Sequence, residues 1–328
     1  MALAPCVAGI DIGGTNSGVG IVDRAGICLA ETSIPTNAKE PAGQLVRRLV
    51  GAIEALQAPL KMTHALKGIG IGAPSANYYK GTVETPPNLN WPGTTDVVGM
   101  FRGAIPVPAA ITNDANAAAL GEMLFGAGKG VKDFIVITLG TGLGSGLIVN
   151  GALVYGHDGF AGELGHTIVD HNGRECGCGR RGCLETYVSA PGICKTVFEL
   201  FAVRRAESPL RSIAYTDLTS KMISDAAREG DPIALEAFRI TGEILGRKLA
   251  DAVAHTSPSA IILFGGLSSA GDLIFGPTRR AMEEGMLGLF KGKVRLIPSG
   301  LSEGNAAILG SAALIWNELE AGRVTPTV

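Results

Sequence analysis

One histidine and three cysteines lie close together in the middle of the chain: His166, Cys176, Cys178 and Cys183. Imidazole nitrogen and thiolate sulfur are the donors of a closed structural zinc site, which is tetrahedral and keeps no open position for water. The pattern therefore predicts a zinc ion that shapes a loop and takes no part in chemistry. His171 is an alternative to His166 as the fourth ligand.

Two carboxylates bracket these four residues. Glu163 precedes the histidine and Glu185 follows the last cysteine. We call residues 163–185 the cysteine loop. A metal that fixes the shape of this loop also fixes the two acids. We expect the loop and its acids to form one wall of a polar ligand pocket.

Three turns that contain glycine follow apolar runs: Gly13-Gly14-Thr15, Gly140-Thr141-Gly142 and Gly265-Gly266. Small residues let backbone N–H groups approach an anion closely, as in phosphate sites, although each turn alone also fits an ordinary chain reversal. Neither the P-loop pattern nor the dinucleotide-binding glycine pattern is present. A nucleotide site in this chain therefore requires a different fold.

Two further acids accompany predicted strands. Asp11 lies inside the first apolar run, where an unpaired charge is costly to bury, so we expect a metal–phosphate group or hydrogen-bond donors to meet it. Asp114 follows Asn113 at the start of an alanine-rich helix, where it is either a helix cap or a general base. A base is the acid–base group that phosphoryl transfer to an alcohol needs.

Apolar runs alternate with helical patterns along the chain. Strands are predicted over 7–12, 68–72, 109–112, 134–139 and 260–264, and helices over 41–57 and much of 187–254. The order strand, glycine turn, strand and turn begins near residue 10 and recurs about 127 residues later, which is typical of two related domains. The chain is therefore predicted to be α/β.

The composition is that of a globular protein. Of 328 residues, 46% are hydrophobic and 18% charged, and the net charge is -2. This balance disfavours nucleic acid or an anionic membrane as the main partner. The first residues contain no basic leader, and no apolar stretch reaches about 18 residues, so we expect a cytoplasmic location without membrane association.

Five motifs together resemble the ROK family of sugar kinases and repressors, and within it the bacterial-type glucokinases. The motifs are Asp11-Ile-Gly-Gly-Thr15, Asn113-Asp-Ala-Asn-Ala-Ala118, Leu139-Gly-Thr-Gly-Leu-Gly-Ser-Gly-Leu147, Glu163-Leu-Gly-His166 and Cys176-Gly-Cys-Gly-x-x-Gly-Cys-Leu-Glu185. The resemblance implies an actin-like, ribonuclease-H-like fold of two domains around a central cleft that holds ATP and a hexose. We expect a smaller N-terminal domain of residues 1–118 with about 304–328, and a larger C-terminal domain of residues 119–303 that carries the cysteine loop.

The resemblance also implies a reaction, in which ATP phosphorylates the 6-hydroxyl of a hexose, with glucose the first choice. In the family, the acid that matches Asp114 is the base for this hydroxyl. The matches of Asn113, Glu163, His166 and Glu185 bind sugar hydroxyls, and Asn88 in Pro87-Asn88-Leu89 is a further candidate. Asp11 with Gly13, Gly14 and Thr15 resembles the family's first phosphate loop, and Mg²⁺ is expected near Asp11. Gly140, Thr141 and Gly142 resemble the second phosphate loop, and Gly265 and Gly266 resemble the adenosine motif.

Two residues depart from the family pattern. Asn16 stands where lysine is common, which removes a positive charge near the phosphates, and Ser75 stands where glycine is common near the sugar. An N-acetylmannosamine or N-acetylglucosamine kinase, a fructokinase and a non-catalytic sugar sensor stay open as alternatives. A repressor is disfavoured, because only ten residues precede Asp11 and a helix-turn-helix needs more. By family likeness we expect a homodimer.

Overall fold

The chain folds into two compact units, seen in a computed structural model that describes residues 3–302 and 304–323. The first unit comprises Met1–Val131, Leu153–Gly162 and Ser299–Val328, and the second comprises Lys132–Ala152 and Glu163–Pro298. Each unit has its own hydrophobic core.

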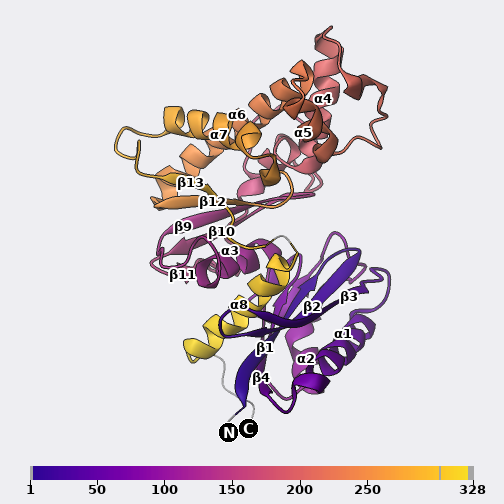
Figure 1. Ribbon diagram of the computed structural model, residues 1–328. Coiled ribbons are helices and arrows are strands. Elements are labelled where there is room, and N and C mark those ends of the chain that lie inside the picture. The colour runs from indigo at the N-terminus through magenta and orange to yellow at the C-terminus, as the bar shows by residue number, and fades with distance from the viewer. Residues whose placement is uncertain (1–2, 303, 324–328) are drawn as a thin grey trace. The chain divides into compact units, whose positions relative to one another are not determined.

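The first unit is built on a five-stranded sheet. Its strand order is β3 (Cys28–Pro35), β2 (Asn16–Asp23), β1 (Ala4–Ile12), β4 (His64–Gly72) and β8 (Ala109–Thr112) (Figure 1). β1 is antiparallel to β2 and parallel to β4, which is parallel to β8. The strands predicted from the sequence are therefore present, and β1 and β4 begin before their apolar centres.

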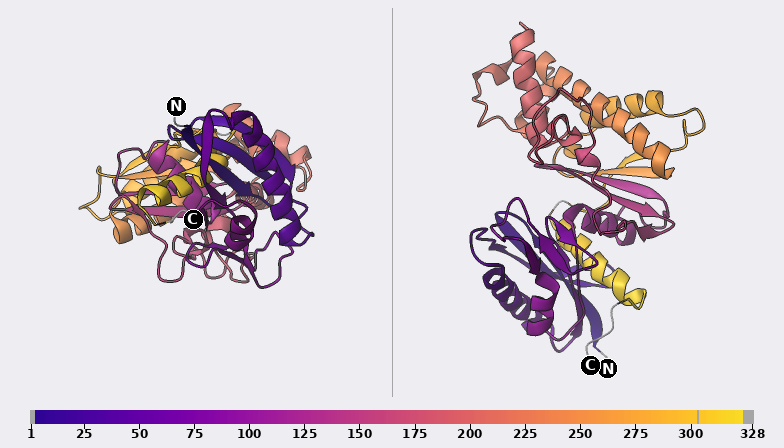
Figure 2. Two further views of the ribbon diagram at one scale, coloured as in Figure 1. Left: turned by 90° about the horizontal axis from the view of Figure 1, so that it is seen from below. Right: turned by 180° about the vertical axis from the view of Figure 1, so that it is seen from behind.

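Helices cover both faces of this sheet (Figures 1 and 2). α1 (Ala42–Gln57) and α2 (Val97–Ala104) lie on one face, and α8 (Ala306–Glu320) lies on the other, with α3 (Asp114–Leu124) packed against it. α8 sits close to the strands because the sheet presents glycines there. A Cβ at Gly70 would overlap the carbonyl oxygen of Ser311 in α8.

A small antiparallel sheet also belongs to the first unit. It consists of β5 (Ala76–Asn77), β6 (Thr82–Glu84) and β7 (Thr94–Asp96). None of these three strands is predicted from the sequence, because strands this short carry no alternating pattern that can be recognised.

The second unit repeats the same sheet plan. Its strand order is β11 (Ala152–Leu153), β10 (Leu143–Val149), β9 (Phe134–Leu139), β12 (Ala260–Phe264) and β13 (Arg295–Pro298). β9 is antiparallel to β10 and parallel to β12, which is parallel to β13. β9 thus corresponds to β1 and β12 to β4, as the repeated order of strand and glycine turn predicts.

The remaining helices belong to the second unit. They are α4 (Ala190–Val203), α5 (Ser220–Arg228), α6 (Pro232–Thr256) and α7 (Asp272–Gly285). Short 3-10 turns lie at η4 (Pro209–Ser212) and η5 (Ser268–Ala270) in the same unit, and at η1 (Ala58–Leu60) in the first unit. α6 and α7 run side by side (Figure 1). α6 begins where the Asp231 carboxylate accepts a hydrogen bond from the Ala234 amide at 2.7 Å. None of the described helices is both long and apolar enough to span a bilayer.

The compact units divide the chain at other positions than the expected domains. Of the expected domains, residues 1–2, 303 and 324–328 lie outside the described part of the chain. A boundary at 118/119 would cut α3, which stays whole in the first unit because it packs against α8. Residues 153–162 also return to the first unit, where Tyr155 stacks on Tyr78 with ring centroids 3.8 Å apart. The last boundary falls before Ser299, whose hydroxyl donates to Glu122 of α3.

Candidate functional site

The polar residues of the first unit gather where parallel strands end. In the register of β1, β4 and β8, Asp11 lies opposite Gly72 and Gly72 lies opposite Thr112. The carboxyl ends of these strands therefore share one edge of the sheet, which is where open α/β sheets bind ligands. The first glycine turn, the loop at Ser75 and the start of α3 all begin at this edge.

The first glycine turn is held by residues outside the motif. The Gly13 amide donates to the carbonyl of Asn16 at 3.2 Å, which closes the turn. The Thr36 hydroxyl donates to the Gly13 carbonyl at 2.7 Å, and the Thr36 amide donates to the Thr15 carbonyl at 2.8 Å. Sequence reasoning did not find Thr36, because a lone buried threonine carries no recognisable signal.

Asn88 lies against the same turn. A Cβ built on Gly14 would be 3.2 Å from the Cβ of Asn88, so a larger residue at position 14 would press on Asn88. The Asn88 residue is exposed. The structure therefore places this candidate beside the first phosphate-type turn.

The two polar residues at the start of α3 have separate local roles. Asn113 is the N-cap, because its side-chain oxygen accepts a hydrogen bond from the Asn116 amide at 2.7 Å. Asp114 is the first helical residue, is exposed, and accepts a hydrogen bond from the Ala115 amide at 2.9 Å. The capping alternative therefore applies to Asn113, and the Asp114 carboxylate is presented at the surface of the unit.

Both acids of this edge hold their protons more tightly than an ordinary aspartate. Burial raises the pKa of Asp11 to about 6, and the nearby charge of Asp114 adds to the rise. Loss of hydration also raises the pKa of Asp114, against the opposing effect of the Ala115 amide and its own amide. Although water reaches the Asp114 carboxylate directly, the surrounding protein excludes much of the water beyond it.

The two departures from the family pattern lie at the same edge. Ser75 has a φ of 52°, a left-handed conformation that favours glycine, which explains why glycine suits this position. Asn16 is exposed at the start of β2.

In the second unit, the beginning of β10 holds both ends of the cysteine loop. The Leu143 amide donates to the Glu185 carboxylate at 2.9 Å. The Leu164 amide donates to the Ser145 hydroxyl at 3.4 Å, and a Cβ at Gly165 would overlap the Leu143 carbonyl. The turns η2 (Leu164–His166) and η3 (Leu184–Thr186) are therefore fixed by the same short segment.

The second and third glycine turns meet at the end of β9. The Gly140 amide donates to the Gly142 carbonyl at 3.0 Å, which closes the second turn. The Leu267 amide, just after the third turn, donates to the Leu139 carbonyl at 3.2 Å. Gly265 has a φ of 99° and lies so close to this carbonyl that a side chain would not fit. Glu185 touches the second turn as well, since its carboxylate occupies the space of a Cβ at Gly142.

The cysteine loop brings together the four predicted metal ligands. The nitrogen and sulfur donors of His166, Cys176, Cys178 and Cys183 all lie within 4.8 Å of one another. Cys178 Sγ is 3.6 Å from Cys183 Sγ, and Cys176 Sγ is 3.7 Å from His166 Nδ1. Donors about 2.0 to 2.3 Å from a tetrahedral zinc ion are separated by nearly these distances. The donor set fits zinc, and the alternative ligand His171 is not part of it.

The candidate residues thus form two groups, one in each unit. Asp11, Gly13, Gly14, Thr15, Asn88, Asn113 and Asp114 share an edge of the first sheet, whereas Gly140, Thr141, Gly142, Gly265, Gly266, Glu163, His166 and Glu185 surround the end of β9 and the start of β10. Each group combines a phosphate-type turn with polar side chains.

We predict that the purified protein holds about one zinc ion per chain, because the four donors already lie at ligand separations. Cys178→Ser should lower the zinc content to less than about half, as measured by atomic emission. Cys28→Ser is the matched control, since Cys28 lies outside the group, and should keep the metal. Wild-type protein with less than about half a zinc per chain would refute the site.

We also predict a pH-dependent gain of stability in Asp11→Asn. An unfolded aspartate loses its proton near pH 4, but the folded Asp11 does so at about 6, so its carboxylate lowers stability increasingly as the pH rises through this window. At about pH 7.5, Asp11→Asn should raise the unfolding free energy by about 1 to 2 kcal/mol, and at about pH 4.5 by much less. Urea unfolding of the ligand-free protein measures this difference. An equal gain in unfolding free energy at both pH values would contradict this prediction. Glu54→Gln is the control, because Glu54 is exposed on α1, and it should show no such pH-dependent gain.

Comparison with known proteins places these features in a family. A sequence model described as the ROK family matches residues 7–318. A glucokinase from Streptomyces coelicolor is 37% identical over 290 residues, which cover 85% of this chain and 88% of that protein. A xylose repressor from Bacillus spizizenii is 31% identical over 252 residues, 77% of this chain and 62% of the repressor.

A solved structure extends the likeness to three dimensions. A ROK family glucokinase from Streptomyces griseus, crystallised with glucose and AMPPNP, has a TM-score of 0.77 and 35% identity, over 94% of this chain and 98% of that one. The expected α/β fold of the actin-like type is therefore confirmed. With five motifs in place and the family model matching residues 7–318, this chain belongs to the ROK family.

Proposed function

We propose that this protein is an ATP-dependent hexokinase that converts glucose to glucose 6-phosphate. The observation that carries the proposal is the likeness to the Streptomyces griseus glucokinase with glucose and AMPPNP, which spans 94% of the chain. The Streptomyces coelicolor relative bears the same name. The glycine turns and the acid at the start of α3 supply the residue types that the reaction requires.

Asp114 is the proposed general base. It accepts the proton of the sugar's 6-hydroxyl as the oxygen attacks the γ-phosphorus and the bond to ADP breaks. The raised pKa of its carboxyl makes the carboxylate a stronger proton acceptor than an ordinary aspartate. Asn113 uses its oxygen to cap α3, so its amide hydrogens are the atoms we assign to a sugar hydroxyl.

Glu163, His166 and Glu185 are proposed to bind the sugar ring. His166 directs Nδ1 toward the cysteine sulfurs, which leaves Nε2 to a sugar hydroxyl. Glu185 accepts a hydrogen bond from the Leu143 amide through one carboxylate oxygen, and its other oxygen, 4.0 Å from Cys176 Sγ, is the atom we assign to the sugar. A pocket of this kind discriminates by hydroxyl pattern, because a missing hydroxyl leaves a buried polar group unpaired. Asn88, beside the first turn, is a further proposed contact.

The turns Gly13–Thr15 and Gly140–Gly142 are proposed to bind phosphate groups through their backbone amides, and Gly265–Gly266 to bind adenosine. Asp11 would hold Mg²⁺ directly or through water, and the cation would neutralise charge on the phosphates. Zinc would keep the cysteine loop in shape and takes no part in the transfer.

We further propose a cytoplasmic homodimer. Four metal-binding thiol and imidazole groups suit a reducing compartment, where cysteines stay unpaired. Sedimentation equilibrium would test the dimer.

A panel of sugars tests the substrate. With ATP and Mg²⁺, glucose should give the highest kcat/KM among glucose, mannose, fructose, N-acetylglucosamine and N-acetylmannosamine, measured as ADP release. Turnover of an N-acetylated sugar without turnover of glucose would replace the proposed substrate. Glucose binding without any ADP release would indicate a sugar sensor, the alternative that the xylose repressor relative keeps in view.

Removal of the proposed base tests the mechanism. Asp114→Ala should fold normally and lose about 100-fold or more in kcat, with a smaller change in the KM for glucose. Asp272→Ala is the matched control, because Asp272 is also the exposed first residue of a helix, α7. It should retain wild-type turnover. Turnover of Asp114→Ala within about threefold of wild type would exclude Asp114 as the base.

A further inference from the structure

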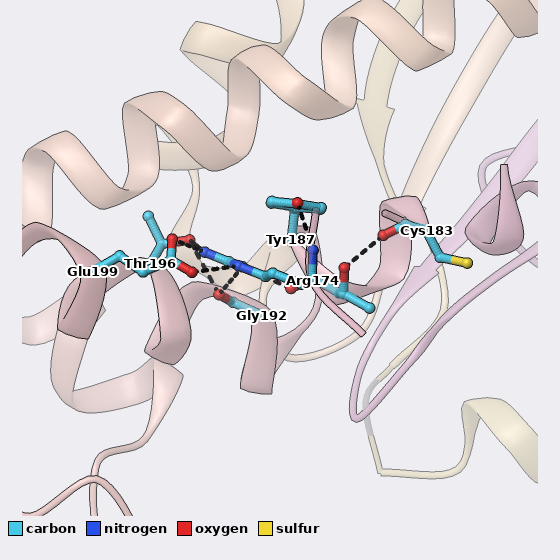
Figure 3. A network of polar contacts seen from close by, with 7 residues as sticks. Arg174, Cys183, Tyr187, Gly192, Thr196 and Glu199 are labelled. Carbon is cyan, nitrogen blue, oxygen red and sulfur yellow. Dashed lines mark hydrogen bonds and ion pairs between the residues drawn. The ribbon is translucent and has the colours of Figure 1, made fainter. Parts of the chain in front are cut away.

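Arg174 lies in the cysteine loop but is not a metal ligand, and it makes an unusually complete set of contacts (Figure 3). Its side chain is only 10% exposed. The guanidinium donates five hydrogen bonds of 2.6 to 3.0 Å, which accounts for all its N–H donors. It also lies over the ring of Tyr187, 4.4 Å from the centroid.

The acceptors of these bonds belong to η3, at the end of the cysteine loop, and to α4, which follows the loop in sequence. One Nη donates to the carbonyl oxygens of Thr186 in η3 and Gly192 in α4, at 2.7 and 3.0 Å. The remaining donors bind Thr196 Oγ1 at 2.9 Å and both carboxylate oxygens of Glu199 at 2.6 and 2.8 Å, all in α4. Arg174 thus ties the middle of the cysteine loop to η3 and to the first three turns of α4.

The residue held between these contacts is Glu185. It occupies the middle of η3, directly before Thr186, whose carbonyl Arg174 binds. The Thr186 hydroxyl donates to the Cys183 carbonyl at 2.8 Å, which closes η3 from the other side. On this fixed turn the Glu185 carboxylate reaches the Leu143 amide at 2.9 Å, beside the second glycine turn.

The shape of the guanidinium matters more here than its charge. Its charged partner, Glu199, is 61% exposed, so water screens this ion pair. The other three hydrogen bonds go to neutral oxygens, two carbonyls from one Nη and one hydroxyl from the other. The planar guanidinium can reach them together because its N–H donors point in several fixed directions. Lysine keeps the charge but cannot bind all these groups at once.

We propose that Arg174 is a positioning residue, which fixes η3 so that the Glu185 carboxylate is aligned for the sugar. This inference rests on the proposed hexokinase function, in which Glu185 binds a sugar hydroxyl. Arg174 itself touches neither substrate. Its role is separate from that of zinc, because its partners lie in η3 and α4 and none of them is a metal ligand.

Arg174→Lys tests the proposal, with Arg181→Lys as the matched control. Arg181 lies in the same loop, and its ion pair with Glu175 is exposed on both sides. Arg174→Lys should raise the KM for glucose about tenfold or more, while kcat and the KM for ATP change less than about threefold. Zinc content should stay at that of wild type. Arg181→Lys should match wild type in every respect.

Hydrogen exchange supplies a readout that needs no activity. In Arg174→Lys the Leu143 amide should exchange about tenfold or more faster, because Glu185 no longer holds it steadily, whereas the amides of β12 should keep wild-type rates. Tyr187→Phe, which removes the hydroxyl that accepts from the Arg174 amide at 3.0 Å, should cause a smaller change in the same direction.

Three results would overturn the proposal. An unchanged KM for glucose with an unchanged Leu143 exchange rate would show that Glu185 is aligned without Arg174. Loss of zinc from Arg174→Lys would make Arg174 a support of the metal site instead. If Arg174→Lys does not fold, wild-type Leu143 exchange in Tyr187→Phe would count against the proposal. A wild-type protein that phosphorylates no hexose would refute the proposed function alone, because the exchange comparison still decides whether Arg174 aligns Glu185.

Discussion

One imidazole and three thiol groups lie within 4.8 Å of one another in the second unit. The shape of the cysteine loop, and with it the positions of the polar side chains it carries, depends on this close approach. The cysteine loop has little regular structure of its own, apart from the turns η2 and η3 and single bridges such as Ile168 to Cys183. A bound ion would close this loop by linking four points along it, and Glu163 and Glu185 lie at its two ends. His166 is one of the four metal-binding groups and lies in η2, which begins next to Glu163 and packs against η3 with Glu185. The positions of His166, Glu163 and Glu185 therefore depend on one another.

The sheet supplies the second half of the design. Both units use the same strand order, so each has an antiparallel hairpin whose turn contains glycine, next to parallel strands that end at the same edge. In the first unit this edge presents Asp11 and Asp114. In the second it supports the cysteine loop, because Leu143 at the start of β10 binds Glu185. One architecture, used twice, thus provides phosphate-type turns and two different sets of polar side chains.

Much of this could be predicted from the sequence. The strands over 109–112, 134–139 and 260–264 have the predicted bounds, since each is an apolar run that ends abruptly at glycine or a polar residue. The four metal donors are also those expected. Long-range packing was not predictable: α3 packs against α8, far away in the sequence, so the first compact unit extends past residue 118. Arg174 was missed for the same reason, because its partners in α4 become visible only in three dimensions.

The central claim is that the metal organises the loop that binds the sugar, and it is tested most directly by the glucose affinity of zinc-free protein. Calorimetric titration of the protein before and after removal of zinc would measure it. The account predicts that the dissociation constant for glucose rises about 100-fold or more while the affinity for an ATP analogue changes little. Unchanged glucose affinity in folded, zinc-free protein would contradict the account.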